Sequence, residues 1–97
     1  MAELLTDDQV TAELSKLPDW TTQDGSLVRT VELESFPKAI QVVNRVAEIA
    51  ENDNHHPDID IRWRTLVFRL STHSSGGITA KDVSLAEEID GVLDALA

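Results

Sequence analysis

The residues of this 97-residue chain that could move protons lie in two short segments. His55 and His56 adjoin each other in the first segment, His73 lies in the second, and the chain has no other histidine. An imidazole gains and loses a proton near neutral pH, so it can serve as a general acid or a general base. Three imidazoles in one part of the chain therefore predict a single site for acid–base chemistry, such as the loss or addition of water at a polarised carbon.

Two carboxylates accompany these histidines. Glu51 lies at the carboxyl end of an expected helix, just before His55 and His56. Asp82 follows His73 and falls in the first turn of the next expected helix. A carboxylate that accepts a hydrogen bond from one ring nitrogen orients the imidazole and fixes its tautomer. Each also has a purely structural interpretation, Glu51 as a solvated helix residue and Asp82 as the partner in a helix-capping box.

Three helices are expected to position these residues. The first begins at the capping box Thr6–Gln9 and ends before Pro18. The second begins at Ser35, carries a wide apolar stripe and ends near Glu51, so the histidine pair lies on the loop that follows. The third begins at another capping box at Thr79 and continues to the carboxyl terminus.

Alternation of apolar and polar residues predicts four strands in two hairpins. Asp24-Gly25 forms the turn of the first hairpin and precedes a strand over Ser26–Glu34. The second hairpin follows the histidine pair, and its two-residue turn is expected at Arg64-Thr65. Trp20 and Trp63 are assigned to the core, because each side chain buries a large apolar area.

The element order helix, two strands, helix, two strands, helix predicts an α+β fold. The expected architecture is a four-stranded antiparallel sheet with three helices packed on one face, in a single domain over residues 1–97. The uncovered face of the sheet would leave Val28 and Thr30 available for a subunit contact. The site forms only if the strand end that carries His73 lies beside the helix end that precedes His55.

Composition excludes several classes of function. The chain has 18 acidic and 8 basic residues and a formal net charge of −10, which disfavours binding to nucleic acid. No apolar run approaches the roughly 20 residues of a membrane span, and the amino terminus lacks the features of a signal peptide. The absence of cysteine excludes disulfides and thiolate metal sites. These features predict a cytoplasmic protein that does not associate with membranes.

A metal site is one alternative use of the three histidines. His55, His56 and His73 together could supply three nitrogen ligands. Adjacent residues rarely direct both rings at one ion, and the sequence has neither a His-Glu-x-x-His motif nor a cysteine ligand. Metal-free acid–base chemistry is therefore the favoured interpretation.

The spacing of the site residues resembles the signature of the pterin-4a-carbinolamine dehydratases. The motif reads Glu51-x-x-x-His55-His56-Pro57, then five residues and Trp63, nine residues and His73, and three residues and Gly77-Ile78-Thr79-x-x-Asp82. The order of the expected elements over nearly the whole chain is also similar to that of the family, and so is the position of Trp20 after the first helix.

The resemblance implies a hydro-lyase that dehydrates 4a-hydroxytetrahydropterin to quinonoid dihydropterin, in the recycling of the cofactor of aromatic amino-acid hydroxylases. It implies a homodimer or homotetramer that needs neither a metal nor an organic cofactor. His55 and His73 match the family's proton-transferring histidines, and His56 matches its third active-site histidine. The positions that match residues around the bound pterin are Glu51, Pro57, Thr72 and Asp82.

The chain departs from the family pattern at two aromatic positions. Ile59 stands where animal members carry tryptophan, and Trp63 stands where tyrosine is common. The loss of a stacking surface at Ile59 bears on substrate affinity or pterin type more than on the chemistry. The alternative function is a non-catalytic dimeric module that stabilises a partner protein or binds a pterin-type cofactor, a role for which three histidines have no evident use.

Overall fold

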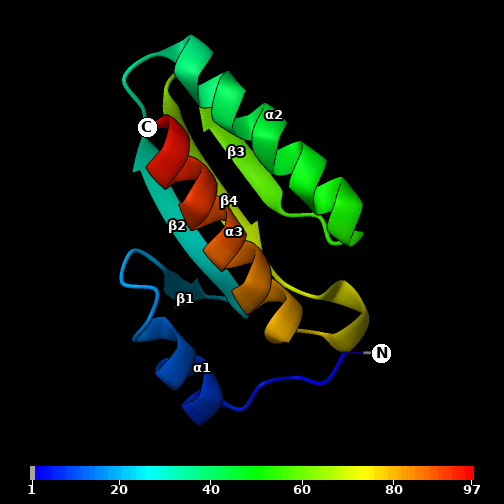
Figure 1. Ribbon diagram of the computed structural model, residues 1–97. Helices are drawn as coiled ribbons and strands as arrows, with labels where there is room; N and C mark the ends of the chain where they lie inside the picture. Colours follow the sequence, from blue (N-terminus) through cyan, green and yellow to red (C-terminus); the bar gives the residue numbers. More distant parts are fainter. Residues whose placement is uncertain (1) are drawn as a thin grey trace.

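The computed structural model describes residues 2–97, in which it places three α-helices, one short 3-10 helix and four strands (Figure 1). In chain order the elements are α1 (Asp7–Leu14), β1 (Thr21–Gln23), β2 (Ser26–Glu32), α2 (Phe36–Asp53), β3 (Asp58–Arg62), β4 (Thr65–Leu70), η1 (His73–Ser75) and α3 (Ala80–Leu96). This order confirms the α+β arrangement predicted from the sequence. Within residues 2–97, no helix has the length and apolar character needed to cross a bilayer.

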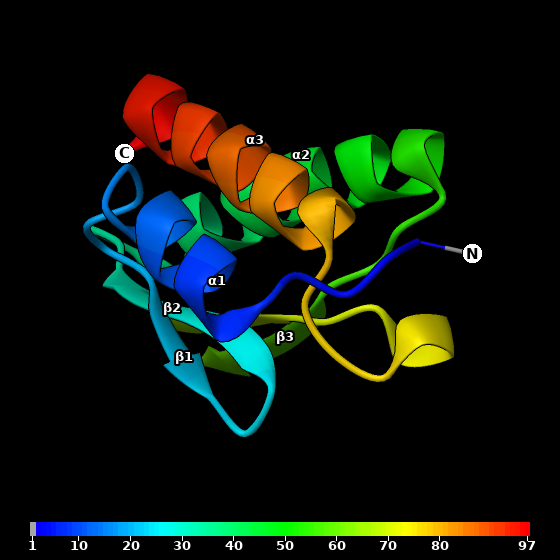
Figure 2. The same ribbon diagram turned by 90° about the horizontal axis from the view of Figure 1, so that it is seen from below.

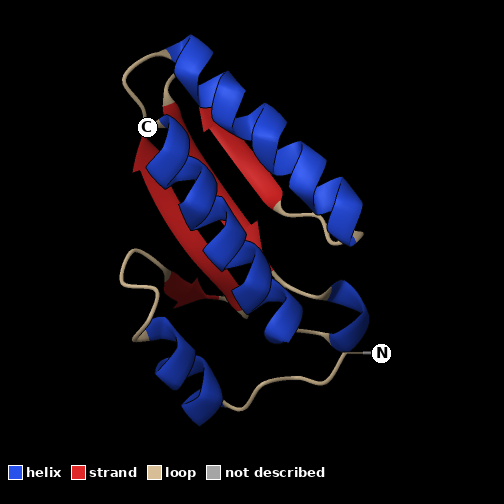
Figure 3. Ribbon diagram, in the orientation of Figure 1, coloured by secondary structure: helices blue, strands red, loops and turns tan. Residues whose placement is uncertain are grey.

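The four strands form one antiparallel sheet in the order β1-β2-β4-β3. Strands β2 and β4 occupy the centre and pair from Leu27 opposite Leu70 to Glu32 opposite Thr65. The three α-helices lie on one face of this sheet, with α2 and α3 side by side and α1 near β1 (Figures 1 and 2). Figure 3 shows that β4 ends at the same end of the molecule at which α3 begins. The sheet thus carries the residues after β4 toward the amino terminus of α3.

The core lies between the sheet and the helices. The inward residues of β4 are almost completely buried, with Leu66 and Phe68 at 0% exposure and Leu70 at 1%. The helices contribute small and branched side chains to the same layer: Ala39, Val42, Val46 and Ala50 from α2, and Val83, Leu85, Ala86, Ile89, Val92 and Leu93 from α3. Trp20 is buried against this core, as predicted.

Helix boundaries follow the capping residues of the sequence. The Thr6 hydroxyl accepts from the backbone N–H of Gln9, whose side chain accepts from the Thr6 N–H, so the first capping box is confirmed. Ser35 caps α2 through its hydroxyl, which accepts from the backbone N–H of Lys38 at 3.1 Å. Helix α2 continues two residues beyond Glu51, to Asp53, and ends where Asn54 adopts a left-handed conformation with φ of 51°.

The turn of the second hairpin differs from the prediction. Arg62 pairs with Thr65, so the turn is formed by Trp63 and Arg64 instead of Arg64 and Thr65. Trp63 adopts a positive φ of 55° and is 71% exposed, so its assignment to the core was wrong. Its ring lies against the Arg64 guanidinium, 4.7 Å from the centroid. A two-residue turn takes Trp63 out of the strand, so the alternation that predicted its burial ends at Arg62.

A polar contact joins α3 to the opposite layer. The Arg29 guanidinium on β2 donates to Asp90 Oδ1 on α3 at 2.5 Å, and the Trp20 indole N–H donates to the same oxygen at 2.8 Å. The Arg29 side chain is only 14% exposed, so this carboxylate compensates a largely buried positive charge. Asp19 lies 3.6 Å from the other end of the guanidinium.

Substitution of the shared carboxylate should therefore destabilise the fold. Asp90→Ala leaves a largely buried guanidinium and an indole N–H without their acceptor, so we expect the free energy of unfolding to fall by about 2 to 3 kcal/mol. Urea denaturation measures this change. Asp94→Ala, an exposed acidic residue of the same helix, is the matched control and should change it by less than about 0.5 kcal/mol. Equal effects of the two substitutions would contradict the structural role of Asp90.

Candidate active site

Three chain segments meet at Asp82. His55 immediately follows the carboxyl end of α2, and its Nε2 lies 2.6 Å from Asp82 Oδ1. Thr72 follows β4, and its hydroxyl donates to Asp82 Oδ2 at 2.8 Å. The segment after α2 and the segment after β4 therefore come together at the first turn of α3, as the site requires.

The position of Asp82 follows from its role in capping α3. Thr79 is the N-cap residue, and its backbone N–H donates to Asp82 Oδ2 at 2.9 Å, so the second capping box is also confirmed. The Asp82 side chain is completely buried. A buried carboxylate is tolerated only when its oxygens are hydrogen-bonded, and the amino terminus of a helix also favours negative charge. Three hydrogen bonds satisfy this requirement here.

The direction of each hydrogen bond around Asp82 can be assigned. A carboxylate only accepts, so the Thr72 hydroxyl gives its hydrogen to Asp82. The hydrogen in the 2.8 Å contact between the Thr72 and Thr79 hydroxyls must then belong to Thr79. The Thr79 oxygen in turn accepts from the backbone N–H of Lys81 at 3.2 Å. This series of hydrogen bonds, from the Lys81 N–H through the hydroxyls of Thr79 and Thr72, therefore runs toward Asp82 and holds its carboxylate in one orientation.

The same reasoning fixes the tautomer of His55. Because Asp82 accepts a hydrogen bond from Nε2 of His55, that nitrogen carries the hydrogen. The neutral ring therefore presents the lone pair of Nδ1 as a base. His56 makes the corresponding contact, with its Nε2 2.8 Å from Glu51 Oε1. The two pairs differ in environment, because the His55 side chain is 12% exposed and that of His56 is 58% exposed. Both contacts between imidazole and carboxylate expected from the sequence are present, and the buried one is held more firmly.

The remaining expected site residues lie nearby without joining this network. His73 begins η1 and is exposed, and no hydrogen bond within residues 2–97 connects its ring to His55 or His56. Pro57 is half-buried and leads into β3. In the described part of the chain, no group of three or more His, Asp or Glu side chains is arranged to hold a metal ion. The pocket that all three imidazoles would share stays a prediction.

His55 also borders a cavity of about 410 Å³ beside the amino-terminal half of α3. This volume lies in the range that holds a small organic ligand. The cavity is lined by Asp53, His55, Ala80, Lys81, Ser84 and Glu88. Sequence reasoning missed all of these except His55. Ala80, Ser84 and Glu88 follow one another at intervals of four residues, so their common helix face was the signal that could have found them.

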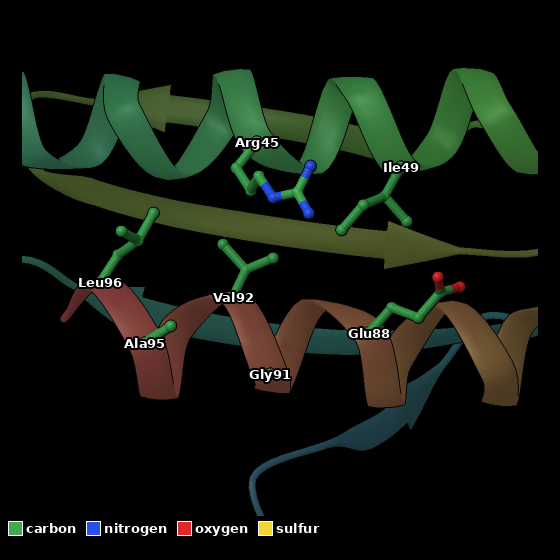
Figure 4. Close-up of a pocket in the computed structure, with 7 residues that line it drawn as sticks. All are labelled: Arg45, Ile49, Glu88, Gly91, Val92, Ala95 and Leu96. Atoms are coloured by element: carbon green, nitrogen blue, oxygen red, sulfur yellow. The ribbon is translucent and has the colours of Figure 1, made fainter.

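Glu88 separates this cavity from a groove farther along the helices. The groove measures about 340 Å³, contains no histidine and lies between α2 and α3 (Figure 4). Figure 4 shows the Glu88 carboxyl directed from α3 toward α2. Burial, a side-chain hydrogen bond with Asp53 and the negative charge of Asp53 together raise the pKa of Glu88 from 4.5 to about 6, and burial has the largest effect.

Comparison with known proteins agrees with the motif. The family model described as pterin 4 alpha carbinolamine dehydratase matches residues 3–92. The chain belongs to this family. Relatives that bear the family's name include a protein of Nocardia farcinica, 59% identical over 91% of this chain and 93% of its own length. Another, of Mycobacteroides abscessus, is 60% identical over 90% of this chain and 93% of its own length.

Two solved structures share the fold of this pterin-4a-carbinolamine dehydratase family member. A transcriptional coactivator/pterin dehydratase from Brucella melitensis superposes with a TM-score of 0.88 at 26% identity, over 91% of this chain and 96% of the other. A pterin dehydratase-like protein that is a RuBisCO assembly factor in the α-carboxysome gives a TM-score of 0.62 at 15% identity, over 75% of this chain and 84% of the other. The second likeness shows the fold alone.

Removal of one acceptor from the central carboxylate should weaken both the helix cap and the imidazole contact. Both carboxylate oxygens of Asp82 face only hydrogen-bond donors. In Asp82→Asn an amide N–H₂ group replaces one of these oxygens and cannot accept, so we expect the free energy of unfolding to fall by about 1 to 3 kcal/mol. The ¹⁵N NMR spectrum of neutral wild-type protein should show His55 as the Nε2–H tautomer, and the variant should lose this preference. Asp58→Asn, at an exposed residue, is the control. Unchanged stability and an unchanged tautomer would contradict the assigned network.

The raised pKa of Glu88 predicts a dependence of stability on pH. The folded state binds this proton more tightly than the unfolded chain, so the stabilising contribution is complete below pH 4.5 and is lost as the pH rises through about 6. Relative to Glu88→Gln, the wild type should therefore lose stability across this interval. The loss should stay below about 1 kcal/mol, because solvent screens the partly exposed carboxyl. Urea denaturation across the interval measures it, and Glu87→Gln should show no such relative change.

Proposed function

We propose that this chain is a hydro-lyase that dehydrates 4a-hydroxytetrahydropterin to quinonoid dihydropterin, in the recycling of a tetrahydropterin cofactor. Membership of the pterin-4a-carbinolamine dehydratase family supports the reaction class. The observation that carries the proposal is the 2.6 Å contact between His55 Nε2 and the buried Asp82, which leaves His55 Nδ1 as a base beside a cavity. Base catalysis requires a positioned nitrogen of this kind.

The reaction needs one proton donor and one proton acceptor. The 4a hydroxyl takes a proton and leaves as water, the ring N–H beside the carbinol carbon loses a proton, and a C=N double bond forms between carbon and nitrogen. No net proton, electron or co-reactant is required. We assign acceptance of the N–H proton to His55, and donation to the leaving hydroxyl to a protonated His56 or His73. The orientation of His55 by Asp82 and of His56 by Glu51 supports these roles.

The residues assigned to substrate contact or orientation are Glu51, Pro57, Thr72 and Asp82. Thr72 gives its hydroxyl hydrogen to Asp82, so we propose that it acts by holding the carboxylate that orients His55. Pro57 directly follows the histidine pair and directs the chain away from it into β3. Glu51 is mostly exposed, at 82%, so its pairing with His56 contributes less than that of Asp82 with His55.

We further propose that residues 1–97 act as a single domain in the cytoplasm, as a homodimer or homotetramer, without a metal or an organic cofactor. The helices cover one face of the sheet, and the other face is free to contact a second subunit (Figure 2). Because this dehydration needs only a proton donor and a proton acceptor from the protein, the imidazoles and carboxylates of the site can supply the catalysis.

The dehydration rate of freshly generated 4a-hydroxytetrahydropterin tests the proposal. Ultraviolet absorbance follows the reaction for wild type, for His55→Ala, His56→Ala and His73→Ala, and for Asp94→Ala as the surface control. General acid–base catalysis typically contributes about 10² to 10⁴ in rate. We therefore expect His55→Ala and at least one other histidine substitution to lose most of the acceleration, while Asp94→Ala retains it. Circular dichroism of each variant confirms that the fold is intact.

Two outcomes would contradict the proposal. If folded wild type does not accelerate dehydration, a non-catalytic dimeric module that stabilises a partner or holds a pterin becomes the leading function. If wild type is active and His55→Ala retains full activity, the assignment of His55 as the base is wrong, although the reaction itself stands.

A further inference from the structure

The cavity beside His55 has two carboxyl groups along one side. Asp53 is the last residue of α2, and Glu88 lies on α3 at the border of the cavity. We propose that Asp53 and Glu88 are specificity-determining residues, which make this cavity accept uncharged substituents and reject anionic substituents on the ring system bound next to His55. The inference rests on the proposed function, because it concerns the part of the substrate that lies beyond the reacting ring.

The backbone fixes both carboxyl groups relative to His55. Only Asn54 separates Asp53 from His55, and the N–H groups of Asn54 and His55 both donate to the carbonyl of Ala50, the latter at 3.1 Å. Glu88 comes from the neighbouring helix and points toward α2 (Figure 4). Asp53 and Glu88 both line the cavity, and a side-chain hydrogen bond joins their carboxyl groups across the gap between the helices. A group that enters the cavity from the side of His55 therefore meets this pair.

The ionised side chains that line the His55 cavity, Asp53, Glu88 and Lys81, sum to one negative charge. The groups that face Glu88 are Asp53 and Arg45 from α2, Lys81 from its own helix, and His55 from the segment after α2. Arg45 borders the groove on the other side of Glu88 and lies 3.5 Å from Glu48. Apart from the His55 imidazole, Lys81 is thus the one basic side chain among the six residues that line the His55 cavity, against two carboxyl groups. With Glu88 ionised, an anion in the cavity faces net repulsion, to which the chain's overall charge of −10 adds.

The strength of this selection should depend on pH. The pKa of Glu88 lies at about 6, so its carboxyl group is mostly ionised near pH 7 and mostly protonated near pH 5. The penalty for an anionic substituent should therefore be larger near pH 7. A hydroxyl-bearing substituent meets no such penalty, because a hydroxyl can donate to either carboxylate.

Two stable pterins that differ in one substituent test this inference. The probes are 6-hydroxymethylpterin, which is uncharged at that position, and pterin-6-carboxylate, which is anionic. Fluorescence titration measures the Kd of each probe for wild type, Glu88→Gln and Asp53→Asn. Near pH 7 we expect wild type to prefer the hydroxymethyl probe, and each substitution to tighten binding of the carboxylate probe by ~3- to 10-fold. Binding of the uncharged probe should change by less than about twofold.

Glu87→Gln is the matched control, because it removes the same charge from the adjacent position of α3 but lines a different cavity. It should leave the ratio of the two Kd values unchanged. Near pH 5 the Glu88 carboxyl is mostly protonated, so the ratio of the two Kd values for wild type should approach the ratio for Glu88→Gln.

Three results would overturn the inference. The first is a Kd that changes by the same factor for both probes in Glu88→Gln. The second is a change in the ratio of the two Kd values in Glu87→Gln that is as large as the change in Glu88→Gln. The third is a wild type that binds neither probe, together with no acceleration of dehydration. In that case the proposed function fails and the inference fails with it. If dehydration proceeds and the ratio does not respond to Glu88→Gln, only the inference is wrong.

Discussion

The burial of one carboxylate is the constraint on which the rest of the structure depends. Asp82 lies completely inside the protein, where an unsatisfied carboxylate would be strongly destabilising. Its hydrogen bonds come from His55 after α2, Thr72 after β4 and Thr79 at the start of α3. Satisfying this group therefore requires the ends of three elements to meet. The same contacts that cap a helix also orient an imidazole, so fold and site share one set of interactions.

Helix α3 is held by acidic side chains at two levels. Asp82 fixes its first turn to the segments that carry the site residues, and Asp90, two turns later, fixes its middle to Arg29 and Trp20. Glu88 lies between these two anchors and faces α2 across the interhelical gap. The helix is thus constrained in both translation and rotation, and its cavity-lining residues keep a defined position relative to His55.

Local chemistry was read correctly from the sequence, whereas contacts between distant residues were not. The capping boxes at Thr6 and Thr79 each depend on residues three positions apart. The sequence suggested that Asp82 could orient an imidazole, but not that the imidazole would be that of His55, 27 positions away. The turn at Trp63 was misplaced by one residue, because alternation alone does not reveal which residue leaves the strand. The cavity formed with Glu88 depends on how α2 and α3 pack, which no local pattern specifies.

The left-handed conformation of Asn54 limits which sequences this site can tolerate. Asn54 is exposed and makes no side-chain contact that the site uses, so it would ordinarily accept many residues. Its φ of 51° is strained for branched and bulky side chains, and glycine, asparagine and aspartate adopt it most readily. Because the next residue is His55, such strain would shift the ring relative to Asp82. A saturation library should therefore find position 54 as restricted as a buried one, with the restriction arising from backbone handedness and not from packing.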